Sequence, residues 1–484
     1  MNSSEGIRHH PSIIIEQLLG VLFTLAILFF VLYETTSYSK YLFLLAIVSV
    51  IVSYLWWKRT LIYFEDDELV IERNLVSKVK KTIPYNKIAS VNIERKILNR
   101  LFGTSALKIN INSGVNALEP EATLVFKEDF AVKVRAELSA KLFDHSYAEC
   151  VAADDVKPLI NFTFKDILIH SIFGMPTGQS LLALIFLAWT VISLFLQGSG
   201  VMVPLILFIL TEILPSLGGV IKFYNFKMYR NGDSIHVQHG MLQTYRSSFK
   251  ISRINAVCIK QPFLARLLKK SSIELEVVGL SDSNGKQPTI CLLANDALIP
   301  GVMNELLPEF IYDHHSIKQP AVAKYPILFG YSLAAIVAVL ILVAVGFVSM
   351  PYILDISGLN SSSLIVYIFG LLAVLTVASL FVAAHQSYTI REFDMGKDLF
   401  TFVNGIVDRE TSIVSYDRVQ IIETRSSHIA RHFGLAKCKI SLLSSMGERN
   451  ITSGYFYESE LSKVSDRIME RLRDGEYDYR LNGA

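Results

Sequence analysis

Long hydrophobic runs separated by mixed polar and apolar segments dominate the pattern along this chain. Six of these runs approach the roughly 20 apolar residues that a helix needs to cross the hydrocarbon core of a bilayer. They come in close pairs, so each pair predicts an antiparallel transmembrane hairpin. The pairs are Ile13–Tyr33 with Tyr41–Trp57, Leu181–Leu196 with Val201–Ile221, and Pro326–Phe347 with Leu364–Ala384. A polar loop containing Asp355 and Asn360 is expected inside the third hairpin.

An ungapped internal repeat follows the hairpins. Tyr85–Ile111 can be laid on Ile251–Val277 and on Tyr416–Leu442, with shifts of 166 and 165 residues. The hairpins recur at the same spacing, which is about a third of the chain. A repeat of this length indicates that the chain consists of three copies of one structural unit.

The hydrophobic period within the repeated block changes twice. Apolar residues first alternate, as at Val91 and Ile93, which predicts a strand with one buried face. Leu98, Leu101 and Phe102 then stand at helical spacing, which predicts one helical turn packed on a core. Alternation resumes from Leu107 to Ile111. The common unit is therefore predicted to be strand, helical turn, strand.

Each copy is expected to be extended at both ends of this block. Upstream, the aligned residues Asn74, Gly240 and Gly405 end a strand, and they predict a turn with positive φ. Downstream, the segments Glu128–Phe143, Asn295–Ile311 and Ser459–Asp474 are predicted to form closing helices, because apolar residues recur in them at helical spacing or helix formers predominate.

The distribution of charge predicts the orientation in the membrane. Of 46 Lys and Arg residues, only Lys40 lies in a link inside a hairpin. By the positive-inside rule, the soluble segments and both termini should lie in the cytoplasm. The formal net charge of +2 argues against a nucleic-acid partner, because phosphate binding requires a concentrated basic face.

With its three copies of the block around Arg100, Arg266 and Arg431, each behind a hairpin, the chain resembles the bacterial pleckstrin-homology-like (bPH2) membrane proteins of the YdbT-like family. The resemblance implies an α+β membrane protein of the bacterial cytoplasmic (inner) membrane. It also implies that each repeat joins a transmembrane hairpin to a PH-like β-sandwich or barrel capped by a C-terminal helix. Phosphoinositide-binding PH domains carry basic residues in the first hairpin loop, where this chain has the acidic stretch Glu65–Glu68.

The repeat divides the chain into three hairpins and three PH-like domains. The hairpins are expected at residues 1–57, 158–221 and 324–386. The PH-like domains are expected at residues 58–145, 222–312 and 387–478.

Candidate binding residues follow from repeated or clustered cations. Arg100, Arg266 and Arg431 are suited to grip lipid phosphates or a partner's carboxylates, and the alternative is that they lie over the hydrophobic turn as structural residues. Lys78, Lys80 and Lys81 form a basic strip that either contacts an anionic leaflet or protects an exposed strand edge.

Glu212 is the candidate for function inside the membrane, since it lies within the fourth hydrophobic run between Pro204 and Pro215. His428 and His432 share a helical face but lack the Glu of a zinc-protease motif, so no metal site is predicted. Four widely spaced cysteines predict neither a disulfide framework nor a zinc ribbon.

These patterns contain no catalytic motif and imply no cofactor, so the chain is interpreted as a non-enzymatic scaffold or envelope-stress component. Its expected partners are membrane lipids, other membrane proteins or further copies of itself. The alternative is a transporter or channel-like protein whose working groups, Glu212 above all, lie in the hairpins.

Overall fold

The structure is a computed structural model of the whole chain. The residues it describes are 6–32, 39–75, 77–111, 120–143, 160–195, 201–277, 287–357, 362–444 and 447–474.

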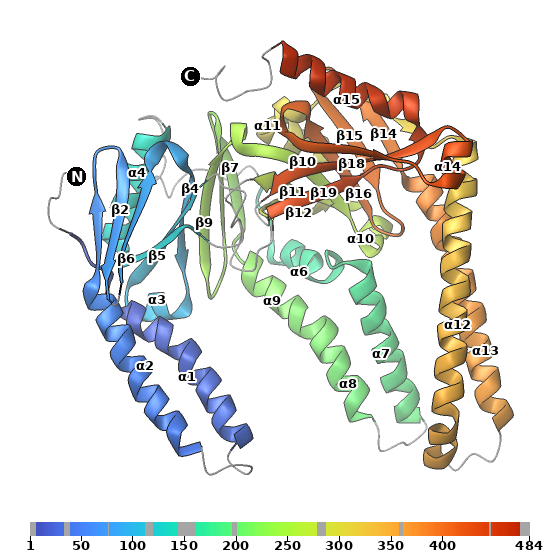
Figure 1. Cartoon of the computed structure of the whole chain (residues 1–484), viewed down its shortest axis with the longest axis horizontal. Helices are drawn as coiled ribbons and strands as arrows, with labels where there is room; N and C mark the ends of the chain where they lie inside the picture. The colour runs from blue at the N-terminus through green and yellow to red at the C-terminus, as the bar shows by residue number, and fades with distance from the viewer. Residues whose placement is uncertain are drawn as a thin grey trace.

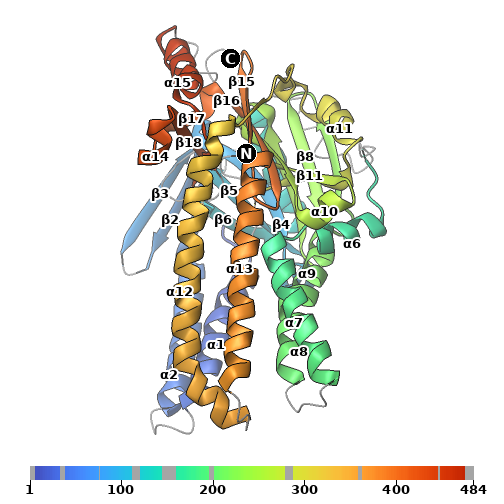
Figure 2. The ribbon, with the colours of Figure 1, turned by 90° about the vertical axis from the view of Figure 1, so that its right-hand side faces the viewer.

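Three pairs of long apolar helices extend from one side of a layer of strands (Figures 1 and 2). The helices are α1 (Ser12–Leu32), α2 (Ser39–Arg59), α7 (Thr177–Phe195), α8 (Met202–Phe208), α9 (Leu214–Phe223), α12 (Lys324–Ser357) and α13 (Ser362–Ile390). A π-helical segment, Ile209–Ile213, joins α8 and α9 into one span. Within the described residues, four helices are long and apolar enough to cross a membrane: Thr177–Leu194, Met202–Phe223, Ala321–Val348 and Phe369–Ile390.

The third hairpin differs from its prediction. Helix α12 continues through Asp355 to Ser357, so the residues expected to begin a polar loop are helical. A second helix, α13, begins at Ser362 and continues to Ile390, beyond the predicted end at Ala384. Each extension continues a helix beyond its hydrophobic segment. Continuing the helix gives the backbone amide and carbonyl groups of these residues hydrogen-bond partners. Asn360 lies outside the described residues.

Each repeat contributes two small antiparallel sheets. In repeat 1 these are β1 (Thr60–Phe64), β2 (Glu68–Asn74) and β3 (Lys78–Pro84), then β4 (Ile88–Arg95), β5 (Thr104–Ile111) and β6 (Ala122–Lys127). The short helix α3 (Ile97–Leu101) separates β4 from β5, as the change of period predicts. Helix α4 (Glu128–Phe143) closes the repeat and packs on its strands.

Repeats 2 and 3 follow the same order. The strands of repeat 2 are β7 (Lys227–Asn231), β8 (Ser234–His239), β9 (Thr244–Lys250), β10 (Ile254–Gln261), β11 (Lys270–Val277) and β12 (Thr289–Asn295). Those of repeat 3 are β14 (Glu392–Met395), β15 (Leu399–Asn404), β16 (Arg409–Ser415), β17 (Val419–Arg425), β18 (Leu435–Ser444), β19 (Gly447–Thr452) and β20 (Phe456–Tyr457). Their remaining helices are α6 (Phe164–Phe173), α10 (Phe263–Leu267), α11 (Ile299–Leu306), α14 (His428–His432) and α15 (Glu458–Arg473).

The sheets continue from one repeat into the next. Strand β4 of repeat 1 pairs with β9 of repeat 2, which gives a sheet of order β6-β5-β4-β9-β8-β7. Strand β10 of repeat 2 pairs with β16 of repeat 3, and this sheet has the order β12-β11-β10-β16-β15-β14-β13. The strand β13 (Ile317–Lys318) comes from the segment between repeats 2 and 3. The three repeats are thus joined through backbone hydrogen bonds.

Most of the alternating apolar residues of the repeated block are buried. Ile88, Val91, Leu107 and Ile109 belong to one core cluster that also contains Leu138 of α4. Equivalent clusters contain the strands and closing helices of repeats 2 and 3. Period-2 alternation therefore identified the inward faces of these strands correctly.

The helical turns lie where the sequence predicts them, but their apolar residues do not pack inward as expected. Leu101 is 76% exposed and Leu267 is 66% exposed, whereas Asn99 and Ala265 point into the protein. The turns lie beside the starts of the hairpins (Figure 1), where α3 contacts α1 and the Phe263 amide donates to Thr177 Oγ1 at 3.0 Å. The exposed residues Leu101 of α3 and Leu267 of α10 therefore belong to turns that lie beside the hairpins.

The prediction of positive φ is confirmed at two of the three aligned positions. Gly240 has φ +115° and Gly405 has φ +137°, and a Cβ at either would lie within 2 Å of a backbone oxygen, at 1.8 and 1.7 Å respectively. The prediction is wrong for Asn74, which remains in β2 and lies opposite Lys78 of β3. The turn in repeat 1 therefore begins one residue later.

Candidate functional site

The junctions between repeats contain several buried charged groups, among them Glu94 and Glu276. Both junctions use the same register, because Ile93 lies opposite Arg246 and the equivalent Ile259 lies opposite Thr411. A buried charged group destabilises the fold unless it is paired. The partners of these groups therefore identify the contacts that hold the repeats together.

The first junction is formed around the turn between β8 and β9. Glu94 of β4 is 2% exposed and contacts Lys108 Nζ and Gln243 Nε2. Arg100 donates to Met241 O and to Thr244 Oγ1, both at 2.5 Å. Repeat 1 therefore holds this turn of repeat 2 through two separate side chains.

Helix α4 adds a second polar contact across the same junction. Arg135 of α4 is 5% exposed and donates from Nη2 to Ser248 Oγ of β9 at 2.9 Å. His236 Nδ1 lies 2.8 Å from the same hydroxyl and its ring stacks on Tyr229. Burial, with a smaller contribution from Arg135, lowers the pKa of His236 to about 4, so this imidazole is neutral at pH 7.

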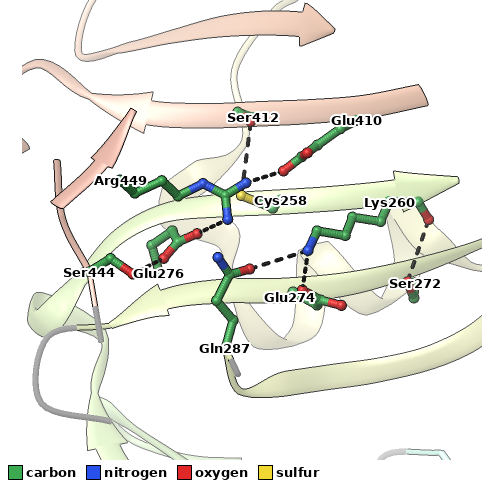
Figure 3. Close-up of polar contacts among 10 residues, drawn as sticks. All are labelled: Cys258, Lys260, Ser272, Glu274, Glu276, Gln287, Glu410, Ser412, Ser444 and Arg449. Atoms are coloured by element: carbon green, nitrogen blue, oxygen red, sulfur yellow. Dashed lines mark hydrogen bonds and ion pairs between the residues drawn. The ribbon is translucent and has the colours of Figure 1, made fainter. Parts of the chain in front are cut away.

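The second junction contains a ladder of alternating charges (Figure 3). Arg449 of β19 contacts the carboxylates of Glu276 and Glu410, which come from different repeats. Glu276 is fully buried and also accepts from Ser444 Oγ at 2.6 Å. Lys260 lies opposite Glu410 in the sheet and contacts Glu274 Oε2 at 2.5 Å.

The carboxylates keep both cations of this ladder charged. Burial lowers the pKa of Lys260, but Glu274 and Glu410 outweigh that effect and raise it overall. Burial likewise lowers the pKa of Arg449, and the net pKa still lies above its usual range because acidic groups including Glu276 and Glu410 surround the guanidinium. The ion pair of Arg449 with Glu276 thus connects repeat 3 to repeat 2, and Lys260 lies opposite Glu410 across the same junction.

A cavity of about 1070 Å³ lies between hairpin 2 and the junctions. Gln179, Pro215 and Gly218 line it from within the two candidate membrane spans of that hairpin. At the strand layer it is lined by apolar side chains such as Leu98 and by charged ones such as Lys96. The cavity therefore extends from the two candidate membrane spans of hairpin 2 to charged residues of the strand layer.

Asp408 of repeat 3 and His170 of α6 fix the rim of this cavity. Asp408 Oδ2 accepts from the amide of Thr177 at 3.1 Å, so it caps the start of α7, where a helix favours negative charge. His170 Nδ1 accepts from the amide of Leu293 at 3.2 Å, and its ring packs edge-on against Phe223. Burial lowers the pKa of His170 to about 3, with a smaller effect from Lys222.

The cations predicted from sequence lie on four different elements: Arg100 on α3, Arg266 on α10, Arg431 on α14, and Lys78, Lys80 and Lys81 on β3. Arg266 and Arg431 are exposed, and within the described residues their guanidinium groups make no hydrogen bond or ion pair. Lys81 pairs with Glu121 at 2.6 Å, Lys80 lies 3.9 Å from Glu72, and both belong to β3, the last strand of its sheet. Glu276 and Arg449 were not among the residues predicted from sequence. Glu276 alternates with the apolar residues Leu275 and Val277 and is buried where Arg449 of repeat 3 contacts it.

Three stretches of the chain, residues 18–142, 167–302 and 326–472, match the family described as Bacterial PH domain. The chain is also similar to the UPF0699 transmembrane protein YdbT of Bacillus subtilis (strain 168), with 19% identity over 433 residues that cover 83% of each chain. No solved structure matches the chain. Each matched stretch ends in the closing helix of one repeat, so the predicted triplication and the family resemblance are confirmed.

Replacing Arg449 with Met should weaken the second junction strongly. Among the residues that the structure describes, Ser444 would be the remaining side-chain hydrogen-bond partner of the fully buried Glu276. Breaking a buried pair in this way costs about 3–5 kcal/mol. Thermal unfolding of the detergent-solubilised chain should therefore begin at a lower temperature. The double variant Arg449→Met, Glu276→Gln removes the unpaired charge and should recover much of the loss. An unchanged unfolding temperature in the single variant would contradict the role assigned to this pair.

Acid should destabilise the fold through its buried histidines. His9, His170 and His236 have pKa values lowered to about 4, 3 and 4, well below the value of about 6.5 in an unfolded chain. As the pH falls from 6.5 toward 4, these histidines bind protons in the unfolded chain but not in the folded one. The free energy of unfolding therefore falls by about 1.4 kcal/mol per pH unit for each group, and it is unaffected by them above pH 6.5. The unfolding temperature should fall across this range, and His170→Asn should flatten the fall. A variant as acid-sensitive as the parent would exclude His170 as a contributor.

Proposed function

The chain belongs to the Bacterial PH domain family, and on this basis we propose that it is a non-enzymatic membrane scaffold with three PH-like lobes on the cytoplasmic side of a bacterial membrane. Each lobe would be a PH-like sandwich capped by a helix and carried by its own transmembrane hairpin. The observation that carries the proposal is the continuity of the sheets, which fixes the three lobes as one platform above the hairpins (Figure 1).

The distribution of side chains supports the cytoplasmic placement of this platform. Nearly all Lys and Arg residues lie in the segments outside the hairpin links, as the positive-inside rule requires of cytoplasmic segments. The exposed apolar residues Leu101 and Leu267 belong to α3 and α10, which lie beside the hairpins, and such residues suit the interfacial layer of a bilayer. In that layer Arg266 would meet lipid phosphates, to which guanidinium binds bidentately.

The cavity beside hairpin 2 is the proposed ligand site of the platform, and the ligand class is a membrane phospholipid. Pro215 and Gly218 within the spans suit acyl chains, while Lys96 of the strand layer and Lys222 at the end of its span suit a phosphate headgroup. Because the pocket reaches Gln179 and Pro215 within the candidate spans, a ligand from the bilayer fits it better than a soluble ligand. Proteins that bind the platform at the inner leaflet would then contact a surface formed partly by the bound lipid.

Filling the cavity should remove the bound lipid. A Cβ on Gly218 meets no atom within 4 Å, so Gly218→Trp should fill the space without displacing the backbone. Native mass spectrometry of the purified chain should show several-fold less co-purified phospholipid for this variant. Gly178→Trp is the matched control, since Gly178 is equally open on the same hairpin but does not line the cavity. Equal lipid retention in both variants would contradict the lipid site.

Transport is the alternative function, and one observation favours it. Glu212 lies in the π-helical segment of hairpin 2, a type of distortion frequent at functional sites. Its Oε2 atom is buried without a hydrogen-bond partner among the described residues. A proton relay needs a series of ionisable groups across the bilayer, whereas Lys222 at the helix end is the other charged residue of the two hairpin 2 spans.

Proton flux into proteoliposomes separates the two functions. The scaffold proposal predicts that the wild-type chain adds nothing to the flux of empty liposomes and that Glu212→Gln leaves lipid retention unchanged. A flux that requires the wild-type chain and disappears in Glu212→Gln would establish transport and overturn the scaffold as the main function.

A further inference from the structure

Every repeat has the same two sheet edges, and two of these edges lack a partner strand in the described part of the chain. The third strand of a repeat (β3, β9 or β16) ends one sheet, and the fourth strand (β4, β10 or β17) begins the next. Strand β4 pairs with β9 and β10 pairs with β16. This leaves β3 of repeat 1 and β17 of repeat 3 at the ends of their sheets.

The two existing junctions define how the remaining edges would meet. The two junctions pair equivalent residues of successive repeats. The same residue pairing can therefore be written for β17 and β3, by applying the repeat shifts of 166 and 165 residues. It places Thr424 opposite Lys80, Glu423 opposite Lys81, and Ile421 opposite Ile83. Pro84 falls just beyond the paired length, as its counterpart Ser415 does in the second junction, so its missing amide hydrogen costs no ladder bond.

The side chains on the two edges are complementary in this register. Each lysine of β3 faces an acidic or neutral residue: Lys81 faces Glu423, Lys80 faces Thr424 and Lys78 faces Ser426. A slip of one residue would set Lys80 against Arg425, and like charges directly opposite are destabilising. Pairing of β3 with a second β3 would oppose lysines in the same way, so the charges select β17 as the partner.

Burial in the existing junction shows what the open edges are missing. Ala256 of β10 is fully buried where repeat 3 covers it. The equivalent residue of β17, Ile421, is larger and more apolar, yet it is 57% exposed. Val79 on β3 is 40% exposed. Both apolar residues would be covered by the same pairing.

A second copy of this chain can supply the missing partner strand. Repeat 1 and repeat 3 lie at opposite ends of the strand layer, and the described strands show no pairing between them (Figure 1). All three hairpins extend in the same direction (Figures 1 and 2). The movement that relates one repeat to the next therefore leaves the hairpins in one membrane plane. A second copy added by the same step would keep its hairpins in the same bilayer.

We propose that β17 of one chain pairs antiparallel with β3 of a second chain, which continues the sheet head to tail across chains in the membrane plane. Such a heterologous interface closes into a ring when the rotation permits it and otherwise extends as an open array. The inference goes beyond the proposed lipid-binding scaffold, since the pairing does not involve the cavity of hairpin 2.

Cross-linking of two differently tagged chains tests the pairing. One full-length chain carries Thr424→Cys and the other Lys80→Cys, both with Cys150→Ser; the native cysteines 258, 291 and 438 are buried. Coexpression and mild oxidation in membranes should link one tag to the other and give few dimers of either tag alone. Because each chain has one accessible cysteine, a link between tags must join two chains. Lys463→Cys on exposed α15 replaces Thr424→Cys in the control pair and should give at least tenfold less product.

Exchanging the charges tests the register independently of the added cysteines. Glu423→Lys in the first chain should reduce the yield several-fold, and Lys81→Glu in the second chain should restore it. No product above the control pair, or a yield indifferent to both charge changes, would overturn the proposal. Lipid retention by the same preparations reports separately on the cavity, so failure of the pairing and failure of the lipid site are distinguishable.

Discussion

Backbone hydrogen bonding between the edge strands of successive repeats is the interaction on which the rest of the structure depends. A sheet edge exposes a row of amide and carbonyl groups that must find partners in protein or water. Pairing β4 with β9 and β10 with β16 satisfies four such edges within one chain. It also sets the spacing of the lobes and therefore of the hairpins beneath them. The cavity beside hairpin 2 exists because three repeats are held around it.

The buried charges act on this framework as determinants of register. A buried ion pair contributes little net stability, because removing two charges from water costs about as much as their attraction returns. A shifted pairing of the repeats would leave Glu276 or Arg449 buried alone, so we interpret this pair as a determinant of register more than of total stability. Glu94 has the same role at the first junction, where Lys108 and Gln243 share its carboxylate.

The sequence predicts local structure well and the junctions poorly. Period-2 alternation located the inward faces of β4 and β5, and the change of period located α3. The same reasoning placed Leu101 in a core, because apolar spacing does not distinguish a protein interior from a bilayer interface. Glu276 could not be recognised as buried, since its hydrogen-bond partner Ser444 lies 168 residues away along the chain, in the next repeat. What was missing was the pairing between repeats, which a single repeat does not encode.

Hydrogen exchange of the detergent-solubilised full chain tests the continuity of the sheets most directly. In a continuous platform, β10 and β16 are interior strands with partners on both sides. The amides of both strands should therefore exchange as slowly as those of β11. If alternate amides of β10 and β16 exchanged as fast as those of an open edge, the repeats would be separate lobes on a flexible chain, and the shared platform would not exist.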